Sequence, residues 1–388
     1  MTASETSNGA DGKPKPAVLI IGGLGYIGRF LATHIQNNNL ASTLRIVDKQ
    51  LPELAQLAPE HFSACKPLHL QADASRPQSL SRIFDLEPAA DGNPRQFDYV
   101  FNCGGETRFS QDDEVYKLRS FNLSTNAGKE AAKRGVKAFV ELSTGSVYDA
   151  KRDPPRKEND KLKPTHRQAK WKLAAEEELA RIPDLPLVVL RLANVYGPYA
   201  GGWLGTQMAL ARVYQDQGKE MKWLWSSDLR TATAHVEDVA RACWAAAEWK
   251  AKGDSDAATL SPPTTPISPT MKGSISSGVA FNIATMAAII KDLFKIETGF
   301  QGTLINTFAR LNLEHVVDDV NDDTLDPWAE MQQKAGIEGG ASPLTPFMEK
   351  ELLRDNDLSL DGGKFERTTG FSLPDTPTRE LPKMKSNE

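Results

Sequence analysis

Short apolar runs alternate with longer stretches of helix-forming residues through the first half of the chain. A continuous apolar run that is bounded by glycine or polar residues is typical of a strand buried on both faces. Strands that alternate with helices predict an α/β protein with a Rossmann-type doubly wound parallel sheet. The predicted strands cover residues 17–21, 44–47, 67–71, 97–102, 136–142 and 185–192.

The predicted helices of this half begin after residue 28, at Asn122 and near Thr165. The helix from Asn122 ends at Arg134 and is followed by Gly135, which is a favourable C-terminal cap. Thr165-x-x-Gln168 fits a capping box, so we expect Thr165 to cap the helix that continues to Arg181.

Beyond about residue 194 the predicted elements become shorter and less regular, which indicates a second, smaller lobe. They are a helix over 206–217, a strand over 221–225, a helix from 235 to 250, a strand over 279–283 and a helix over 287–294. Trp223 and Trp225 alternate on the strand at 221–225, which is more typical of a core than of ligand stacking.

Composition suggests where this organisation is interrupted. Residues 1–16 are polar and predict a disordered lead-in, and 251–278 are rich in Ser, Pro, Thr and Gly, which predicts a disordered insertion. We expect the sheet domain over 17–250, with part of the smaller lobe from about 194. The rest of that C-terminal lobe would cover 279–373, followed by a polar tail over 374–388.

Composition also limits the classes of protein. Of the 388 residues 40% are hydrophobic and 25% charged, as in an ordinary globular protein, and the net charge of −5 indicates no nucleic-acid partner. Three scattered cysteines are too few for a disulfide framework or a zinc site. The chain shows no apolar run near the ~20 residues of a membrane span and no secretory signal. We therefore expect a cytoplasmic protein without a metal or a membrane partner.

The strand at 17–21 runs into three glycines with the spacing G-x-x-G-x-x-G, at Gly22, Gly25 and Gly28. Gly22 lets the chain turn sharply, Gly25 leaves room for a pyrophosphate, and Gly28 lets the following helix pack closely. The N-terminus of that helix offers N–H groups and a partial positive charge to phosphates. This pattern predicts dinucleotide binding; the alternative is a glycine-rich turn without a ligand.

Two acids follow the next strands. Asp48 ends the second strand, where a carboxylate can accept hydrogen bonds from the adenosine ribose hydroxyls. A carboxylate repels a 2′-phosphate, so Asp48 favours NAD, whereas Lys49 beside it keeps NADP as an alternative. Asp73 follows the third strand and has two interpretations: a hydrogen bond to an adenine amino group, or a helix cap before Pro77.

Together these features resemble the extended short-chain dehydrogenase/reductases, and within them the NAD-dependent epimerase/dehydratase family of nucleotide-sugar enzymes. The segments that carry the resemblance are the glycine motif, Asp48, Asp73, STGSVYD at 143–149, RLANVYGP at 191–198, HVEDVARA at 235–242 and LDGGK at 360–364 with TGF at 369–371. The resemblance implies a homodimer and NAD bound by Gly22, Gly25, Tyr26, Ile27, Gly28, Asp48, Asp73, Cys103, Gly104 and Lys172.

The resemblance also implies a catalytic group. In this family a tyrosine removes the proton of the substrate hydroxyl, a lysine four residues later lowers the pKa of that tyrosine, and a Ser or Thr binds the same hydroxyl. Thr144 and Lys172 match the hydroxyl and lysine positions, against the alternatives of a loop-capping hydroxyl and a solvated lysine. Gln168 stands where the tyrosine would be, and an amide cannot act as a general base.

A second register offers a different base. His166 and Lys170 are also four residues apart, and a histidine can take a proton near neutral pH. The alternative for His166 is a polar residue in the first helical turn.

On the substrate side, the resemblance implies roles for Asn194, Tyr196 and Arg230. Thr231 stands where relatives often carry a phosphate-binding arginine, and Arg230 lies one residue away. Arg230 is therefore either a phosphate contact or a surface charge, and the segment Tyr196-Gly197-Pro198 is also typical of a turn.

Three functional hypotheses follow. The first is hydride transfer with NAD on a small-molecule substrate, a nucleotide sugar or a similar hydroxyl compound. The second is a non-catalytic NAD(P)-binding regulator or assembly partner, which the glutamine at position 168 favours. The third is an oxidoreductase on a non-sugar alcohol or ketone.

Overall fold

The structure is a computed structural model that describes residues 14–88, 95–150, 154–253, 258–265, 281–338 and 342–374. Its centre is a seven-stranded sheet in the order β10-β6-β5-β4-β1-β2-β3, and all of its strand pairs are parallel. The strands are β1 (Ala17–Ile21), β2 (Thr43–Asp48), β3 (His69–Gln71), β4 (Tyr99–Asn102), β5 (Ala138–Thr144), β6 (Leu187–Leu192) and β10 (Ala258–Leu260). This arrangement confirms the Rossmann-type doubly wound sheet.

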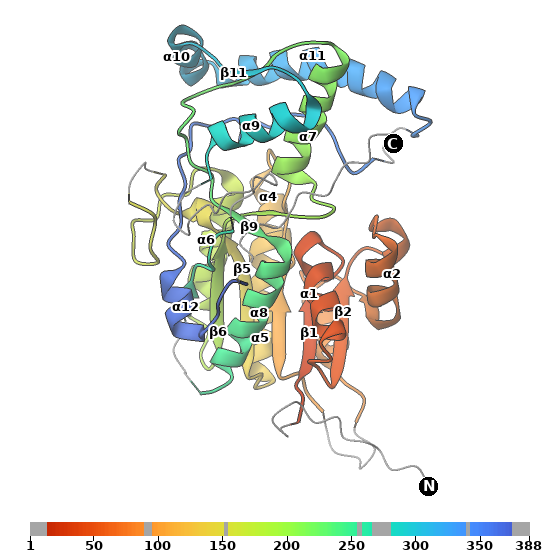
Figure 1. The fold of residues 1–388 in the computed structure, drawn as a ribbon. Coiled ribbons are helices and arrows are strands. Elements are labelled where there is room, and N and C mark those ends of the chain that lie inside the picture. Colours follow the sequence, from red (N-terminus) through yellow and green to blue (C-terminus); the bar gives the residue numbers. More distant parts are fainter. Residues whose placement is uncertain are drawn as a thin grey trace.

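Helices cover both faces of the sheet because alternate residues of each strand point to opposite sides. On β1, Val18 and Ile20 pack with α1 (Tyr26–Asn37) and α8 (Val236–Lys250), whereas Leu19 and Ile21 belong to the core of the other face. That second face is covered by α3 (Leu80–Phe84), α5 (Leu123–Lys133) and α6 (Arg167–Leu179) (Figure 1). The shorter elements are α2 (Pro59–Cys65), α4 (Asp113–Tyr116), a π-helical segment over Lys117–Asn122, and 3-10 turns at Pro52–Leu54, Lys66–Leu68, Pro77–Ser79 and Gly145–Val147.

A smaller lobe lies beyond the carboxyl ends of the strands (Figure 1). Its two small sheets are parallel pairs, and its own core includes Tyr196, Trp223, Ile290 and Phe294. The elements of this part of the chain are β7 (Asn194–Tyr196), α7 (Gly202–Asp216), β8 (Met221–Trp223), β9 (Thr233–His235), α9 (Ile283–Phe294), β11 (Thr298–Phe300), α10 (Thr303–Leu311), α11 (Leu313–Lys334) and α12 (Gly363–Thr369). The lobe is more regular than expected, because α11 alone has 22 residues.

Two predictions from composition are corrected. The insertion over 251–278 contains β10, whose residues pair with Val188, Val189 and Leu190 of β6 at the sheet edge. Three residues within a Ser- and Pro-rich run carry too weak a pattern for a strand to be recognised. The predicted strand over 279–283 is also wrong at its end, because Asn282 caps α9 and its side chain accepts a hydrogen bond from Thr285 N.

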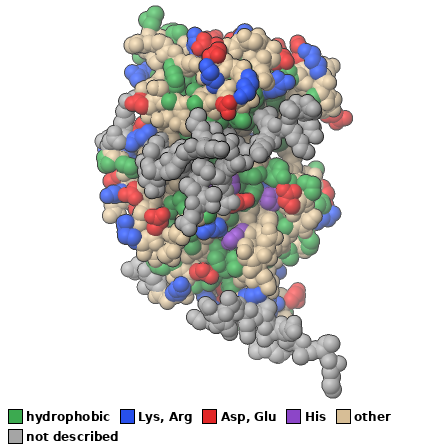
Figure 2. All heavy atoms as spheres, in the orientation of Figure 1, with side chains coloured by type: hydrophobic (Ala, Val, Ile, Leu, Met, Phe, Trp, Pro, Cys, Tyr) green, Lys and Arg blue, Asp and Glu red, His purple; other side chains and the backbone are tan. Residues whose placement is uncertain are grey.

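The other predicted boundaries fall partly outside the described residues. These are 1–13 of the lead-in, 254–257 and 266–278 of the insertion, residues 279 and 280, and 375–388 of the tail. Within the described ranges no helix is both long enough and apolar enough to cross a membrane. On the face shown in Figure 2, acidic and basic side chains are interspersed rather than separated by sign.

The loop between β1 and α1 allows a test of the fold. A Cβ at Gly28 would lie 2.6 Å from Gly23 Cα and would also collide with the carbonyl oxygen of Gly22. We expect Gly28→Ala to lower the free energy of unfolding by about 1–3 kcal/mol, because backbone atoms cannot yield as a flexible side chain can. Urea unfolding followed by circular dichroism measures this loss.

The matched control is Gly302→Ala, where nothing lies within 4 Å of the added methyl group. This change should alter the free energy of unfolding by less than about 1 kcal/mol. A Gly28→Ala protein as stable as wild type would contradict the packing described for the loop.

Candidate functional site

A cavity of about 710 Å³ opens at the carboxyl ends of β1, β2, β4, β5 and β6. The strand order reverses between β1 and β4, and such a switch point leaves a crevice in which α/β proteins bind ligands. The cavity brings together most of the predicted site residues: Gly22, Gly25, Tyr26, Ile27, Asp48, Asp73, Cys103, Gly104, Thr144, Gln168, Lys172 and Asn194. Residues predicted from segments far apart in the chain thus line one space.

The glycine loop forms one wall of the cavity. Gly22 has a φ of +72°, and a Cβ there would lie 2.6 Å from the backbone of Gly104 at the end of β4. Gly25 is the N-cap of α1 and makes no side-chain cap, so the first N–H groups of the helix have no side-chain acceptor there. Arg29 holds the loop from outside, since its Nη2 donates to Leu24 O at 2.8 Å. Gly28 packs on Gly22 and Gly23 rather than lining the cavity.

Asp48 and Asp73 line the same end of the cavity. The Asp48 carboxylate accepts hydrogen bonds from Leu24 N at 3.2 Å and Gln50 N at 3.1 Å, which ties β2 to the glycine loop. Asp73 accepts from Ser75 N at 3.0 Å and does not cap the turn at Pro77–Ser79, because Arg76 is its N-cap. The helix-cap interpretation of Asp73 is therefore wrong, and the adenine interpretation stays a prediction.

Lys172 is partly buried rather than solvated, with 13% of its side chain exposed. Its Nζ donates to Leu142 O at 2.7 Å and lies 3.5 Å from Glu141 Oε1. Glu141 is fully buried, and its carboxylate also accepts hydrogen bonds from Asn102 Nδ2 at 2.5 Å and Ser124 Oγ at 2.8 Å. Sequence reasoning missed Glu141, although an acid in the middle of an apolar strand was a usable signal.

Gln168 is held by the backbone that follows β4. Its Nε2 donates to Glu106 O at 3.2 Å and to Thr107 O at 3.1 Å. Gln168 therefore links α6 to this loop.

Glu106 is a second buried acid that sequence reasoning missed. Its carboxylate accepts from Arg108 Nε at 2.9 Å and from Arg119 Nη1 at 2.8 Å. Burial alone would raise the pKa of Glu106, but the hydrogen bonds from the two guanidinium groups outweigh it and lower the pKa to about 2. Glu106 is therefore a weak base at neutral pH.

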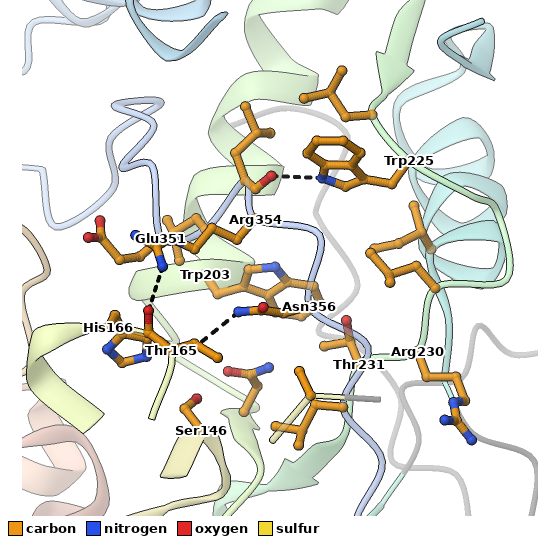
Figure 3. Close-up of a pocket in the computed structure, with 18 of the residues that line it drawn as sticks. Ser146, Thr165, His166, Trp203, Trp225, Arg230, Thr231, Glu351, Arg354 and Asn356 are labelled. Carbon is orange, nitrogen blue, oxygen red and sulfur yellow. Dashed lines mark hydrogen bonds between the residues drawn. The ribbon is translucent and has the colours of Figure 1, made fainter. Parts of the chain in front are cut away.

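His166 caps α6 in place of Thr165. Its Nδ1 accepts a hydrogen bond from Ala169 N at 3.2 Å, so the predicted capping box is wrong. Thr165 instead accepts from Asn356 Nδ2 and Arg354 (Figure 3). Burial, with a smaller contribution from Arg354, lowers the pKa of His166 to about 4. A neutral imidazole that accepts at Nδ1 carries its proton on Nε2, so His166 is a donor and not a base.

Thr144 and Cys103 also line the cavity. Thr144 Oγ1 accepts from Ser146 N at 3.1 Å, as expected of a capping hydroxyl, and its own O–H is still able to donate. Burial raises the pKa of the Cys103 thiol well above its usual value, which keeps the sulfur protonated.

A smaller cavity of about 130 Å³ adjoins the first, and Phe109, Asn194, Trp203 and Leu352 line both. It lies between the sheet domain and the lobe, and its other lining residues include His166, Trp223, Trp225, Arg230, Arg354 and Asn356 (Figure 3).

Trp223 and Trp225 of the small cavity are buried, as expected, but they line it as well. Trp223 Nε1 donates to Gln207 Oε1 at 3.1 Å and Trp225 Nε1 donates to Leu353 O at 2.8 Å, so both indole N–H groups are bonded within the protein. Trp225 has a φ of +71° and lies beyond the end of β8, so the predicted alternation on one strand is wrong.

The residues expected on the substrate side are separated. Arg230 lines the small cavity, but its Nε donates to Asp357 Oδ1 at 2.8 Å and its guanidinium points away from the other labelled residues (Figure 3). Tyr196 is 2% exposed in the core of the lobe, with its ring 5.2 Å from that of His235, and it lines neither cavity. Asn194 lines both cavities and is the best placed of the three.

Within the described ranges, no group of three or more His, Cys, Asp or Glu residues could hold a metal ion. The fold and the cavity define an α/β protein of the Rossmann type with a ligand cavity at its switch point. The model of the NAD dependent epimerase/dehydratase family matches residues 18–258, which is more than half of the chain. The chain belongs to this family.

Individual relatives are distant. UDP-glucose 4-epimerase 2 of Oryza sativa subsp. japonica is 26% identical over 195 residues, which are 48% of this chain and 47% of the rice protein. The match thus spans about half the length of that relative. The Bordetella bronchiseptica enzyme WbmG, solved with NAD and UDP, is 16% identical with a TM-score of 0.60, over 93% of this chain and 90% of WbmG.

A third similar structure is the DesIV double mutant, a dTDP-glucose 4,6-dehydratase from Streptomyces venezuelae solved with NAD and DAU bound. It is 16% identical with a TM-score of 0.59, over 92% of this chain and 91% of DesIV. At these identities the two structures support the fold alone.

The cap at His166 predicts a pH dependence of stability. Because its folded pKa of about 4 lies below the unfolded value of ~6.5, the unfolded chain binds more protons between these values. Stability therefore falls as the pH drops through this window, by up to about 3 kcal/mol. Asparagine caps helices well and does not titrate. Between pH 7 and pH 4.5, the free energy of unfolding should therefore fall by about 2–3 kcal/mol less in His166→Asn than in wild type.

Urea unfolding at the two pH values tests this prediction. The control is His315→Asn, because His315 is exposed on α11 and should leave the pH dependence of wild type unchanged. Equal pH dependence in wild type and His166→Asn would show that His166 is not held neutral by the fold.

Proposed function

We propose that this protein catalyses hydride transfer between NAD and a hydroxyl group of a small molecule, with nucleotide sugars as the first substrate class to test. One observation carries the proposal: a single cavity joins the glycine loop and Asp48 to Thr144 and Lys172. The family of the chain and the nucleotide sugars named for its relatives support the proposal.

The residues of the cavity fit a nicotinamide dinucleotide. The pyrophosphate would lie at the N-terminus of α1, where the backbone N–H groups lack a side-chain acceptor and Gly25 opens the approach. Asp48 would accept hydrogen bonds from the adenosine ribose, which favours NAD over NADP. When bound, the nicotinamide ring supplies the acceptor or donor of a hydride.

At the other end of the cavity, Thr144 would donate a hydrogen bond to the reacting oxygen of the substrate. Gln168 cannot ionise, Glu106 is a weak base, and the nitrogen of His166 that is free of the cap bond carries a proton. Lys172 is then the group in the described cavity wall that is suited to exchange a proton with the substrate. Its ammonium would also attract the ribose hydroxyls and the developing alkoxide.

The small cavity favours a second substrate class, a non-sugar alcohol or ketone. Trp223 and Trp225 use their N–H groups within the protein, so their ring faces are what they offer to a ligand. The guanidinium of Arg230 is already neutralised by Asp357, which weakens the case for a phosphate contact there.

The bonds of Gln168 to the backbone favour the non-catalytic NAD-binding alternative, and the absence of NAD reduction would support it.

The test is formation of NADH, measured by absorbance, with NAD and a panel of UDP-glucose, dTDP-glucose and cyclohexanol, after binding of NAD has been measured. We expect Lys172→Met to lower kcat at least ~100-fold, which is typical of the loss of a general acid or base. The control is Lys170→Met, because Lys170 is exposed on the same helix and should retain full activity. Full turnover by Lys172→Met would remove Lys172 from the chemistry.

We also propose a homodimer formed through α5 and α6, by analogy with the family. Leu173 and Ala174 on α6 are partly exposed, and Ala180 follows that helix as an exposed residue, so these side chains are accessible to a second copy. Sedimentation equilibrium at micromolar concentration should give twice the mass of the chain, and a strict monomer would contradict the proposal.

A further inference from the structure

The proposed reaction needs a site for the proton of the substrate hydroxyl, and the usual tyrosine is replaced by Gln168. The ionisable groups near that residue are largely committed elsewhere. Glu106 is bonded to two arginines, His166 accepts the cap bond of α6, and Cys103 stays protonated. Lys172 is the exception, and it is paired with a carboxylate that the family pattern does not require.

Glu141 lies behind Lys172 rather than in the cavity. It sits in the middle of β5, in register with Asn102 of β4 and Val189 of β6, and its carboxylate is fully buried. Only Lys172 of this pair lines the cavity. A Cβ at Gly105 would lie 3.2 Å from Lys172 Nζ, so the glycine keeps this side of the ammonium uncovered.

We propose that Glu141 and Lys172 form one proton-accepting unit, in which Lys172 exchanges a proton with the substrate and Glu141 is the positioning residue that holds the proton behind it. The inference rests on the proposed function. It assigns to two residues of β5 and α6 the part that a single tyrosine plays elsewhere.

The proton balance of the step is simple. The resting pair carries one proton, as an ammonium with a carboxylate or as an amine with a carboxylic acid. The O–H bond of the substrate breaks and its proton bonds to Lys172 Nζ; where Lys172 starts as an ammonium, one of its own N–H protons passes to the Glu141 carboxylate in the same step. The pair then holds two protons, one on each residue. The carbon is oxidised to a carbonyl as its C–H electrons leave with the hydride to NAD, which is reduced.

The surroundings of Glu141 are suited to taking up the second proton. Its carboxylate is faced by Asn102 at the end of β4, Cys103 just after that strand, Ser124 from α5 and Lys172 from α6. Of these described groups only Lys172 is a basic side chain. Burial raises the pKa of Glu141 and outweighs the opposing effects of Lys172 and the hydrogen bonds, so protonation comes within reach at milder pH than for a solvated acid.

The first arm of the test needs no substrate. Infrared spectroscopy of the full-length protein carrying ¹³C-labelled glutamate follows the C=O band of a protonated carboxyl group as the pH falls. We expect a band with a midpoint above the ~4.3 of a solvated glutamate. This band should vanish in Glu141→Gln, shift in Lys172→Met and persist in Glu130→Gln, in which a buried acid paired with Arg134 is removed. The proposal would be overturned if the midpoint of the band lay at or below the ~4.3 of a solvated glutamate. It would also be overturned if the band were unchanged in Glu141→Gln.

The second arm uses NAD and the same panel of alcohols. We expect Glu141→Gln to bind NAD within about threefold of wild type, to lower kcat at least ~100-fold with little change in KM, and to lose the acidic limb of the pH profile of kcat. Glu141→Asp should restore part of the rate, which a merely structural role would not predict. A Glu141→Gln enzyme with the wild-type rate and pH profile would overturn the role of the pair. A wild type that binds NAD but reduces it with no alcohol would overturn the proposed function instead.

Discussion

The close approach of two backbones at the switch point of the sheet determines where the site can form. Gly22 after β1 lies against Gly104 after β4, and a Cβ at Gly22 would come within 2.6 Å of that backbone. The strand ends can be this close only because Gly22 lacks a side chain. The loop then turns away into α1, and the space above the strand ends becomes the large cavity. Asp48 reinforces the arrangement through its bond to Leu24 N.

Buried carboxylates, each paired with a cation, link the elements around this cavity. Glu141 faces Lys172, Glu176 faces Arg191 at 2.6 Å, and Asp357 faces Arg230. Removing one member would leave a buried charge without its partner, which costs far more than the intact pair contributes. These pairs therefore specify how α6, β6 and the C-terminal segment sit against the strand ends, whatever their net effect on stability.

The parts of the fold and site that local patterns encode could be predicted. The strands, the glycine loop and Asp48 follow from residue type, spacing and order along the chain, whereas the positions of Thr144 and Lys172 follow from the resemblance to the family. The pairing of Arg230 with Asp357 could not be predicted, because the two residues are 127 positions apart and neither belongs to a recognisable motif. The Thr165-x-x-Gln168 pattern predicts a cap at Thr165, whereas burial keeps His166 neutral and able to accept the Ala169 N–H. β10 was missed because its pairing with β6 depends on the sheet edge and not on its own sequence.

Gln168 and Glu141 both bear on how the ammonium of Lys172 is stabilised. An ammonium as buried as that of Lys172 needs a nearby anion or a hydrogen-bonding partner, because desolvation costs it several kcal/mol. A phenolate could provide that charge, but the amide of Gln168 cannot, and it is turned toward backbone carbonyls instead. Glu141 at 3.5 Å supplies an attraction of about 5 kcal/mol at an effective dielectric constant of 20, before desolvation is counted. Glu141 thus places an acidic group in the sheet behind Lys172 and away from the cavity wall.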